Sequence, residues 1–413
     1  MNVNIALLRA IVAVVSLLGC SAALAGEDAS SVTVGGFGTL GVVHSNNNQA
    51  DFTANALNPG DAGASRAWSA AVDSRLGVQM ALNLDSKWSA VLQLVSERTL
   101  RDSYAPVVEW ANLQYQVTPD LSVRVGRIAL PLFLTGDYRK AGYALPWVRP
   151  PVELYGAIPL SNSDGVDASY RWQRGDVHNV TQVSLGRADM PLAAAARAQA
   201  RSLAGISNTA TAGALTVRAS VLTSELSVDI VRPLFDGLRG FGAQGQALAD
   251  RYELSAKRAY VASIGFSYDP GQWFMMGEIG RMNTHSFLGD KTAAYAGAGR
   301  RYGDLAPYVV YAASRANMQT RVGGVDVGGL PPPQAMAGAQ LNAGLNQLLA
   351  AIPRQYSITA GVRWDLCPNY ALKLQYDRIT PQQGSTGTFI NVQPGFKSGQ
   401  PITLLSAALD FVF

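Results

Sequence analysis

The chain has 413 residues, of which 48% are hydrophobic and 15% charged, and its formal net charge is +4. It is too apolar to be disordered, and a small basic excess spread over the whole length argues against a nucleic-acid binder. Its three histidines, His44, His178 and His285, are widely spaced, and with two cysteines they predict neither a metal site nor a Cys-His pair. We therefore expect no cofactor.

The N-terminus contains the only long apolar run without charge, over residues 10–25. This run ends in small residues, which is typical of a signal peptide cleaved after residue 25. We expect a signal peptide over residues 1–25 and an exported domain over residues 26–413. Cys20 also lies in a context that resembles a lipoprotein signal, but cleavage at residue 25 removes it. Only Cys367 then remains, so the mature chain cannot form an internal disulfide.

Short segments of the exported domain alternate between apolar and polar side chains with a period of two, which predicts β-strands with two different faces. The first, over 32–44, is rich in glycine and precedes a long polar loop. Alternating runs follow over 73–80, 88–97, 107–116 and 121–126, and the clearest is a hairpin over 355–377. The last run, over 403–413, ends on Phe413.

Turns and loops separate these runs in a regular order. Short turns are predicted at 174–176, 223–225, 269–271, 303–304 and 367–369, and long connections at 129–162, 187–212, 233–256, 284–290, 316–353 and 379–401. The runs number about sixteen, with short and long connections alternating, which favours an all-β transmembrane antiparallel barrel with long extracellular loops. An even number of strands closes without an unpaired edge. Two loop segments, 191–204 and 340–352, have a composition that predicts short helices.

These features together resemble the Gram-negative outer-membrane general porins. The matching motifs are Ser74-Arg75-Leu76-Gly77, Gly126-Arg127, Asp164-Gly165-Val166 and the terminal Phe413. The resemblance implies a 16-stranded homotrimer in the outer membrane of a Gram-negative bacterium, in contact with outer-membrane lipid and lipopolysaccharide. It also implies that the barrel-assembly machinery reads the final strand, and that the third long loop folds into the lumen and narrows it.

The third long loop, residues 128–162, interleaves prolines and aromatic residues with charged residues. Prolines remove conformational freedom and aromatic rings supply packing area, so this segment can hold a fixed shape. A rigid loop inside a water-filled barrel creates a constriction.

The resemblance places Arg75 and Arg127 on a basic wall that faces this loop, with Asp137 and Glu153 as its acids. The sequence departs from that pattern because Ser161-Asn162-Ser163 replaces a further wall arginine, and because the loop carries basic residues of its own. The expected constriction residues are Arg75, Arg127, Asp137, Arg139, Lys140, Arg149 and Glu153, and the expected pore lining is Gln79, Gln93, Arg124, Arg363 and Lys373.

The leading functional hypothesis is a passive channel for small hydrophilic solutes and ions. A basic excess at the constriction would favour anions, because charge in a narrow pore concentrates counter-ions. If Asp137 pairs with Arg139 or Lys140, and Glu153 with Arg149, the pore is nearly neutral instead. The alternatives are a selective channel for organic acids or phosphate, an adhesin, and a barrel enzyme. We expect no enzyme, because the histidines lack the Ser and acid motifs that a nucleophile-base pair requires.

Overall fold

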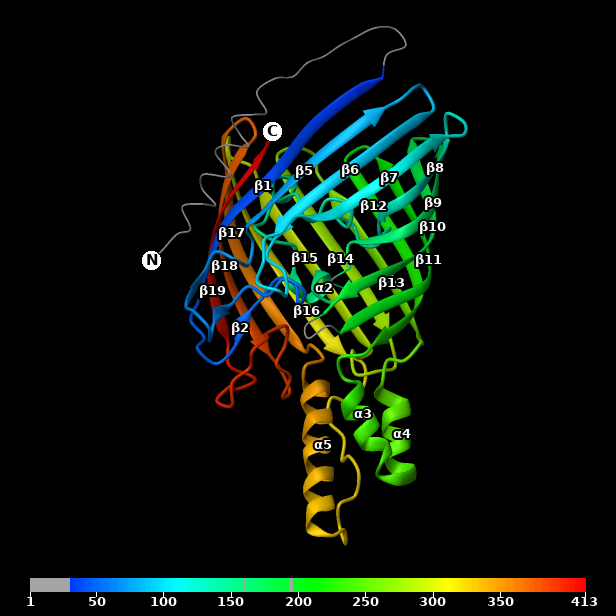
Figure 1. Cartoon of the computed structure of the whole chain (residues 1–413). Coiled ribbons are helices and arrows are strands. Elements are labelled where there is room, and N and C mark those ends of the chain that lie inside the picture. Colours follow the sequence, from blue (N-terminus) through cyan, green and yellow to red (C-terminus); the bar gives the residue numbers. More distant parts are fainter. Residues whose placement is uncertain (1–29, 159, 193–195) are drawn as a thin grey trace.

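The computed structural model describes residues 30–158, 160–192 and 196–413, so the predicted signal peptide lies outside the described residues. Its main element is a closed antiparallel barrel of 16 long strands (Figure 1). They are β1 (Ser31–Ser45), β5 (Arg75–Asn83), β6 (Trp88–Glu97), β7 (Val107–Gln116), β8 (Leu121–Ala129), β9 (Asn162–Arg174), β10 (Val177–Pro191), β11 (Arg197–Ala212), β12 (Leu215–Val228), β13 (Lys257–Tyr268), β14 (Trp273–Asn283), β15 (Lys291–Arg300), β16 (Leu305–Ala316), β17 (Gln355–Cys367), β18 (Tyr370–Pro381) and β19 (Ile402–Val412). The long polar loop after β1 contains three short strands, β2 (Asp51–Phe52), β3 (Ala62–Gly63) and β4 (Trp68–Ser69). The predicted all-β barrel is therefore confirmed.

The barrel closes between its first and last strands. β1 pairs with β19 along one edge and with β5 along the other, so no edge of the sheet stays open. The N–H of Phe413 donates to the Gly36 carbonyl at 3.0 Å, and the N–H of Gly36 donates to the Phe413 carbonyl at 2.8 Å. The Phe413 ring also covers Gly36, where a Cβ would lie 2.4 Å from the ring. A glycine opposite an aromatic ring thus fixes the register of the closing pair.

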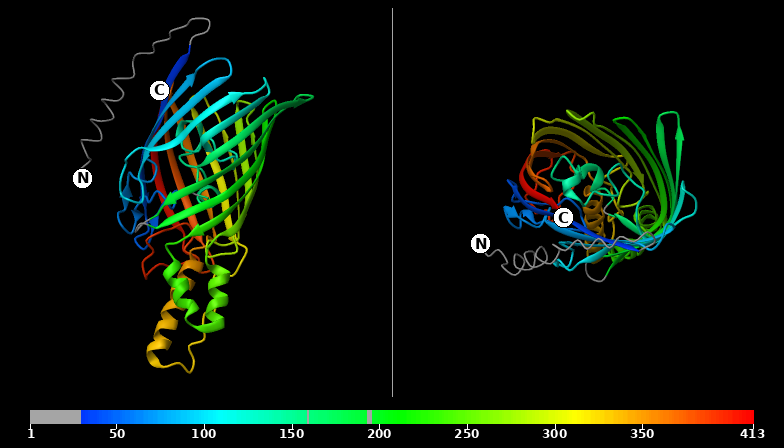
Figure 2. Two further views of the ribbon diagram at one scale, coloured as in Figure 1. Left: turned by 45° about the vertical axis from the view of Figure 1, so that its right-hand side comes forward. Right: turned by 90° about the horizontal axis from the view of Figure 1, so that it is seen from above.

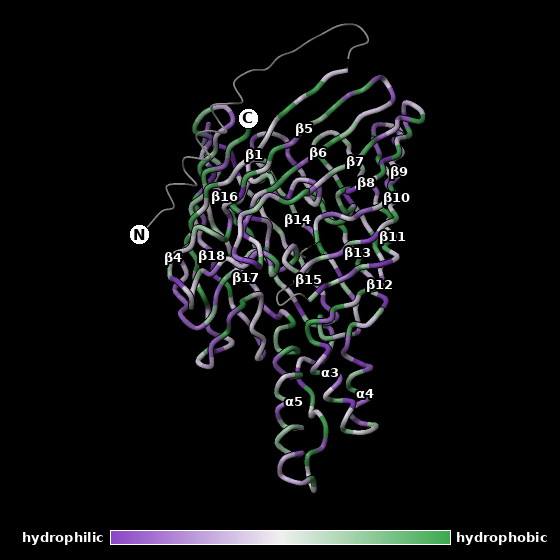
Figure 3. The backbone as a smooth tube through the Cα atoms, viewed as in Figure 1, coloured by the Kyte–Doolittle hydropathy of each residue, from purple (hydrophilic) through white to green (hydrophobic). Residues whose placement is uncertain are grey.

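The two faces of the barrel wall differ in polarity. Large apolar side chains such as Val125 and Leu374 project outward and are more than half exposed, at 56% and 51%. Figure 3 shows polar and apolar residues interleaved along the strands, as the period of two requires. A closed sheet with an exposed apolar band on its outside suits a bilayer, because all of its strand backbone groups pair within the sheet. Among the described helices, none combines the length and the apolar character needed to cross a membrane.

Short turns lie at one end of the barrel and long connections at the other (Figures 1 and 2). Three local predictions were wrong. The first is the long connection predicted over 187–212, because residues 187–191 belong to β10 and residues 197–212 belong to β11. The turn predicted at 223–225 lies inside β12, and the turn before β12 lies instead at Gly213, whose φ is 56°. The helix predicted over 191–204 is also incorrect where the structure describes it, because residues 197–204 belong to β11. Pairing with neighbouring strands overrides the helical propensity of this Ala-rich segment.

Three helices project from the long-loop end of the barrel: α3 (Arg232–Arg239), α4 (Gly242–Tyr252) and α5 (Pro332–Ala350) (Figure 2). They share an apolar core that contains Phe235, Leu238, Tyr252, Leu345 and Leu349. The helix predicted over 340–352 is confirmed and begins earlier, whereas α3 and α4 were not predicted.

Candidate functional site

The connection between β8 and β9, residues 130–161, runs inside the barrel, and we call it the lumenal loop. It contains a 3-10 turn, η1 (Gly142–Ala144), and a short helix, α2 (Val152–Tyr155). The view along the barrel in Figure 2 places this loop within the ring of strands. The predicted inward folding of the third long loop is therefore confirmed.

One side of the lumenal loop packs on an apolar patch of the inner wall. The loop contributes Leu130, Leu132, Phe133, Leu134, Leu145, Trp147, Leu154 and Tyr155, and strands β11–β16 contribute Leu203, Leu222, Val261, Phe274, Met276, Met282, Ala293, Tyr295, Ala306, Tyr308, Val310 and Ala312. Each fully buried Leu or Phe side chain stabilises such a contact by about 1.5–3 kcal/mol. Hydrophobic contact therefore fixes the loop against this half of the wall.

Two wall glycines leave room for the loop. A Cβ at Gly280 would lie 2.8 Å from the Leu154 side chain, and a Cβ at Gly297 would lie 3.0 Å from the Trp147 ring. Larger residues at these positions would push the loop away from the wall. Small residues on the wall are thus part of what holds the loop in place.

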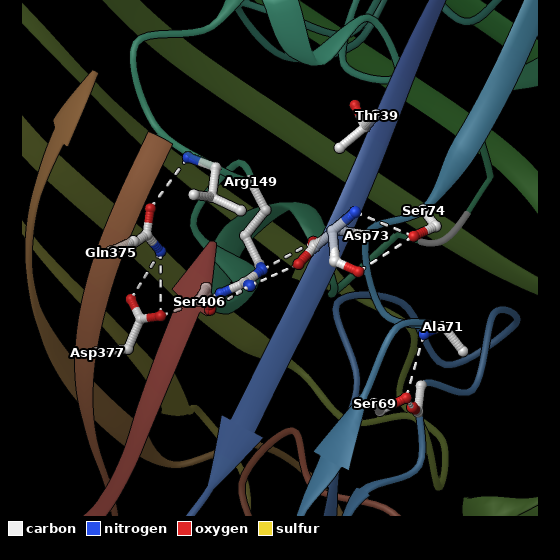
Figure 4. A network of polar contacts seen from close by, with 12 residues as sticks. Thr39, Ser69, Ala71, Asp73, Ser74, Arg149, Gln375, Asp377 and Ser406 are labelled. Atoms are coloured by element: carbon white, nitrogen blue, oxygen red, sulfur yellow. Dashed lines mark hydrogen bonds and ion pairs between the residues drawn. The ribbon is translucent and has the colours of Figure 1, made fainter. Parts of the chain in front are cut away.

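Arg149 joins the lumenal loop to the opposite wall (Figure 4). Its Nε and Nη2 donate to the two oxygens of Asp73 at 2.9 and 2.6 Å, Nη1 donates to Asp377 at 3.0 Å, and Nη2 also donates to Ser406 at 2.7 Å. Burial alone would lower the pKa of Arg149, but the Asp73 and Asp377 carboxylates outweigh it and raise the pKa above its ordinary value. The predicted constriction cation is therefore a buried, fully paired anchor.

Lys140 makes a second anchor between the loop and the wall. Its Nζ lies 2.6 Å from a carboxylate oxygen of Glu97 and 2.8 Å from one of Glu109. Burial alone would lower the pKa of Lys140, yet the two carboxylates outweigh it and raise the pKa. Arg75 lies close enough to act on the Glu97 charge, and its Nε donates to the Asp73 carbonyl at 3.2 Å. Cations and acids therefore alternate across this part of the lumen.

The expected lining residues Arg363 and Lys373 do point inward, but the loop covers them. Lys373 Nζ lies 2.7 Å from Asp410 Oδ2 and donates to the carbonyls of Gly142 and Trp147 at 2.7 and 3.1 Å. Arg363 Nη1 donates to the carbonyls of Tyr143 and Leu145 at 2.6 and 3.0 Å. Their predicted role as lining is thus corrected, because both cations bind backbone oxygens around η1.

The loop acids do not form the pairs considered from the sequence. Asp137 accepts from Arg218 of β12 at 2.9 Å, and not from Arg139 or Lys140. Glu153, only 2% exposed, accepts from Gln355 at 2.8 Å. Burial raises the pKa of Glu153.

The expectation that Arg127 faces the lumen is corrected by the alternation of β8. Arg127 lies two residues after the exposed Val125, so its side chain projects from the same, outer face of the strand. It pairs directly with Asp164 of β9. The Arg127 guanidinium donates twice to the Asp164 carboxylate, at 2.7 and 2.8 Å, on the outer face. Arg124 has the opposite parity and faces inward, where it makes two hydrogen bonds with Asp167, at 3.0 and 2.6 Å.

The open space lies on the other side of the loop. A cavity of about 210 Å³ lies between loop residues 136–141 and the inner wall, and its wall residues include Phe37, Gln79, Gln93, Glu109 and Trp110. A smaller cavity of about 60 Å³ lies beside it and is lined by Arg75, Glu97, Arg139, Lys140 and Arg149, among others. Gln93 Nε2 donates to Gln79 Oε1 at 2.8 Å, so both predicted glutamines face this space.

Several acids of the site were missed at the sequence level. These are Asp73, Glu97, Glu109, Asp167, Asp377 and Asp410, of which all but Asp73 lie on strands. The polar positions of each alternating strand were the signal that could have identified the strand acids. Within the described part of the chain, no cluster of His, Cys, Asp and Glu is arranged to hold a metal ion.

A family model described as Gram-negative porin matches residues 10–395. No curated relative matches the sequence. Among solved structures, an anion-selective porin from Comamonas acidovorans aligns with 93% of this chain and 100% of its own at 14% identity and a TM-score of 0.53. The outer membrane channel DcaP of Acinetobacter baumannii aligns with 94% of this chain and 100% of its own, at 11% identity and a TM-score of 0.54. OmpT, an outer membrane protein of Vibrio cholerae in a trimer form, aligns with 94% of this chain and 100% of its own, at 11% identity and a TM-score of 0.50. At these identities the likeness is one of fold.

Proposed function

Since the chain belongs to the Gram-negative porin family and is an outer-membrane channel for small solutes, we propose that it is a general diffusion channel with weak charge selectivity. The solute path runs between the lumenal loop and the wall formed by β5–β7. The observation that carries this proposal is the position of Lys140 between Glu97 and Glu109, beside the open cavity.

Charges of both signs border this path. A uniform ring of charge would concentrate one kind of ion, whereas alternating charges largely cancel at the distance of a passing solute. The basic excess expected in the loop is offset by acids of the wall, because Arg149 and Lys140 each contact two carboxylates. Of the two selectivities considered from the sequence, this arrangement supports the nearly neutral pore.

Planar-bilayer recording tests the proposal directly. Purified protein should give stepwise conductance in symmetric KCl, and its reversal potential in a KCl gradient should lie close to zero. A large reversal potential of either sign would contradict weak selectivity. Absence of conductance from folded, inserted protein would contradict an open path beside the loop.

We also propose the assembly and the partners that membership of this family suggests. The trimer form of OmpT from Vibrio cholerae supports a homotrimer, and mass measurement in detergent should give three copies of the chain. The final strand, with Phe413 at its end, is proposed as the segment read by the barrel-assembly machinery. Outer-membrane lipid and lipopolysaccharide are proposed to contact the outer face.

A further inference from the structure

Two strands end their outward-facing rows on an arginine. On β14 the row runs through Met275 and Ile279 to Arg281, and on β16 it runs through Val309 and Tyr311 to Arg315. All six of these side chains are exposed. Both arginines lie near the long-loop ends of their strands, just beyond an apolar stretch.

The strand register brings these arginines together. Arg281 pairs with Thr292 of β15, and Thr292 pairs with Arg315. Residues that pair directly across an antiparallel sheet project from the same face. Arg281, Thr292 and Arg315 therefore form one outward row, and the two arginine Cα atoms lie two strand spacings, about 10 Å, apart. We call these three residues the arginine row.

The arginines have little to neutralise them. Across the described residues, Arg315 makes no side-chain hydrogen bond or ion pair, and Arg281 donates only to the neutral side chain of Asn283, at 3.3 Å. Asp290 is the acid that lies two residues before Thr292. Its carboxylate lies 2.7 Å from His285 Nδ1 and accepts hydrogen bonds from two backbone N–H groups, so it already has partners of its own.

Two other outer-face arginines are each paired with an acid. Arg127 pairs with Asp164, and Arg258 pairs with Glu225. An outward ion pair neutralises its own charge, so these two arginines need no ligand. The arginine row instead presents two guanidinium groups that the described residues leave without an acid.

Thr292 adds a third donor to the row. Its Oγ1 accepts a hydrogen bond from Asn317 Nδ2 at 2.8 Å, which leaves the hydroxyl hydrogen available to donate. A surface that offers two guanidinium groups and one hydroxyl suits an anion with several oxygen acceptors. Guanidinium groups match phosphate in particular, because they can donate two parallel hydrogen bonds.

The position along the barrel indicates where the anion comes from. Tyr311 of β16 and Tyr356 of β17 stack with their ring centroids 6.4 Å apart, and Tyr311 lies two outward positions before Arg315. Aromatic girdles mark the boundary between hydrocarbon and headgroups on such barrels. An unpaired arginine is costly in the hydrocarbon and is tolerated at this boundary. The arginine row therefore lies at the headgroup level of the leaflet on the long-loop side.

We propose that Arg281, Thr292 and Arg315 bind the phosphate groups of the phosphorylated glycolipid of the outer leaflet, lipopolysaccharide. The assignment rests on the proposed function, since it requires the long loops to be extracellular. It converts a general lipid contact into a defined site on β14–β16.

Binding of purified lipopolysaccharide to the protein in zwitterionic detergent micelles tests the site. The R281Q/R315Q variant should bind at least tenfold more weakly than the wild type. R174Q is the matched control, because Arg174 is exposed near the short turn after β9, at the other end of the barrel, and its affinity should not change. Lipopolysaccharide stripped of its phosphates should bind the wild type as weakly as intact lipopolysaccharide binds R281Q/R315Q.

Three results would overturn the site: equal binding by R281Q/R315Q, phosphate-independent binding, or equally tight binding of phosphatidylglycerol with the same arginine dependence. Displacement by millimolar inorganic phosphate alone would also overturn it, because it would indicate an unspecific anion site. Single-channel conductance of the same samples separates this test from that of the channel, since R281Q/R315Q should conduct like the wild type. If R281Q/R315Q does not insert, R315Q alone should still bind measurably more weakly, and R315K should restore part of the loss.

Discussion

Lys140 Nζ of the lumenal loop lies 2.6 Å from the Glu97 carboxylate at the end of β6, a wall strand on the opposite side from the loop's apolar contacts. The ion pair spans the remaining gap, so the loop is held from both sides of the barrel. The same contact places opposite charges at the edge of the open cavity. In the proposed path, the residues that hold the loop in position therefore also set the charges that a passing solute meets.

Replacing Lys140 by Gln should make the channel more cation-selective. Glu97 and Glu109 would then face the path without their shared cation, which lowers the local potential. A change of about one kT in the electrostatic energy of a monovalent ion raises the local cation concentration and lowers the local anion concentration, each about threefold, so the permeability ratio of cations to anions changes roughly sevenfold. The reversal potential in a KCl gradient measures this ratio, and E97Q should shift it in the opposite direction. Equal reversal potentials for wild type, K140Q and E97Q would show that the path runs elsewhere.

Arg75 and Arg127 should differ sharply in their effect on selectivity. Arg75 borders the smaller cavity, whereas Arg127 is paired with Asp164 on the outer face. The Arg75→Ser variant should shift the reversal potential toward cation selectivity, and Arg127→Ser should leave it unchanged. Both arginines resemble wall residues of the family in the same way, so Arg127→Ser is a matched control. A shift caused by Arg127→Ser would contradict the outward placement of its side chain.

Much of the barrel was predictable from the alternation of polar and apolar residues, because each strand faces the lumen on one side and the bilayer on the other. The face from which a single side chain projects was harder to predict where a glycine interrupts the alternation. Gly126, with a φ of 126°, has no side chain to show its direction, and Arg127 beside it was placed on the wrong face. The predicted turn at 223–225 failed for a related reason: polar residues such as Ser224 face inward in β12 without ending the strand.

The pairing of the charges could not be predicted from the sequence. Arg149 and Asp377 are 228 positions apart, and only closure of the barrel brings them together. The sequence suggested Glu153 as a local partner for Arg149, four residues away. Helical geometry turns that acid toward Gln355 instead, because α2 begins between them. Local spacing therefore identified the charged residues of the loop but not their partners.

Replacing Asp73 by Asn should destabilise the barrel and loosen the loop. Arg149 would keep Asp377 but lose the carboxylate that accepts two of its hydrogen bonds. Breaking one partner of a buried ion pair costs about 3–5 kcal/mol. Thermal unfolding in detergent should show a clearly lower Tm, and single-channel records should show more frequent current fluctuations. Ser74→Ala, a change at the neighbouring position that removes no charge, should have a much smaller effect; a wild-type Tm for Asp73→Asn would refute the anchoring role.

Glu153 should make stability depend on pH. Burial raises its folded-state pKa above the ordinary value of 4.5. The protonated form is therefore favoured in the folded protein, and stability falls as pH rises from about 4.5 through the folded-state pKa. Glu153→Gln removes this penalty, since its amide oxygen can still accept from Gln355. The Tm of Glu153→Gln should exceed that of wild type at pH 7 and approach it at pH 4; a gap that widens toward acid would contradict the assignment.

Replacing Trp147 by Ala should loosen the lumenal loop on its apolar side. The Trp147 ring is 2% exposed, packs edge to face with Tyr295 and Tyr308 at centroid distances of 5.9 and 6.3 Å, and contacts Gly297. Removing a buried aromatic side chain costs about 3–5 kcal/mol, because the cavity left behind is only partly filled. A loop held mainly by its ion pairs should then move further into the path at times, so single-channel current should become noisier and closures more frequent. Trp172→Ala, which removes an exposed ring from the outer face of β9, should leave the current unchanged. If Trp147→Ala records are as quiet as those of the wild type, the ion pairs alone fix the loop.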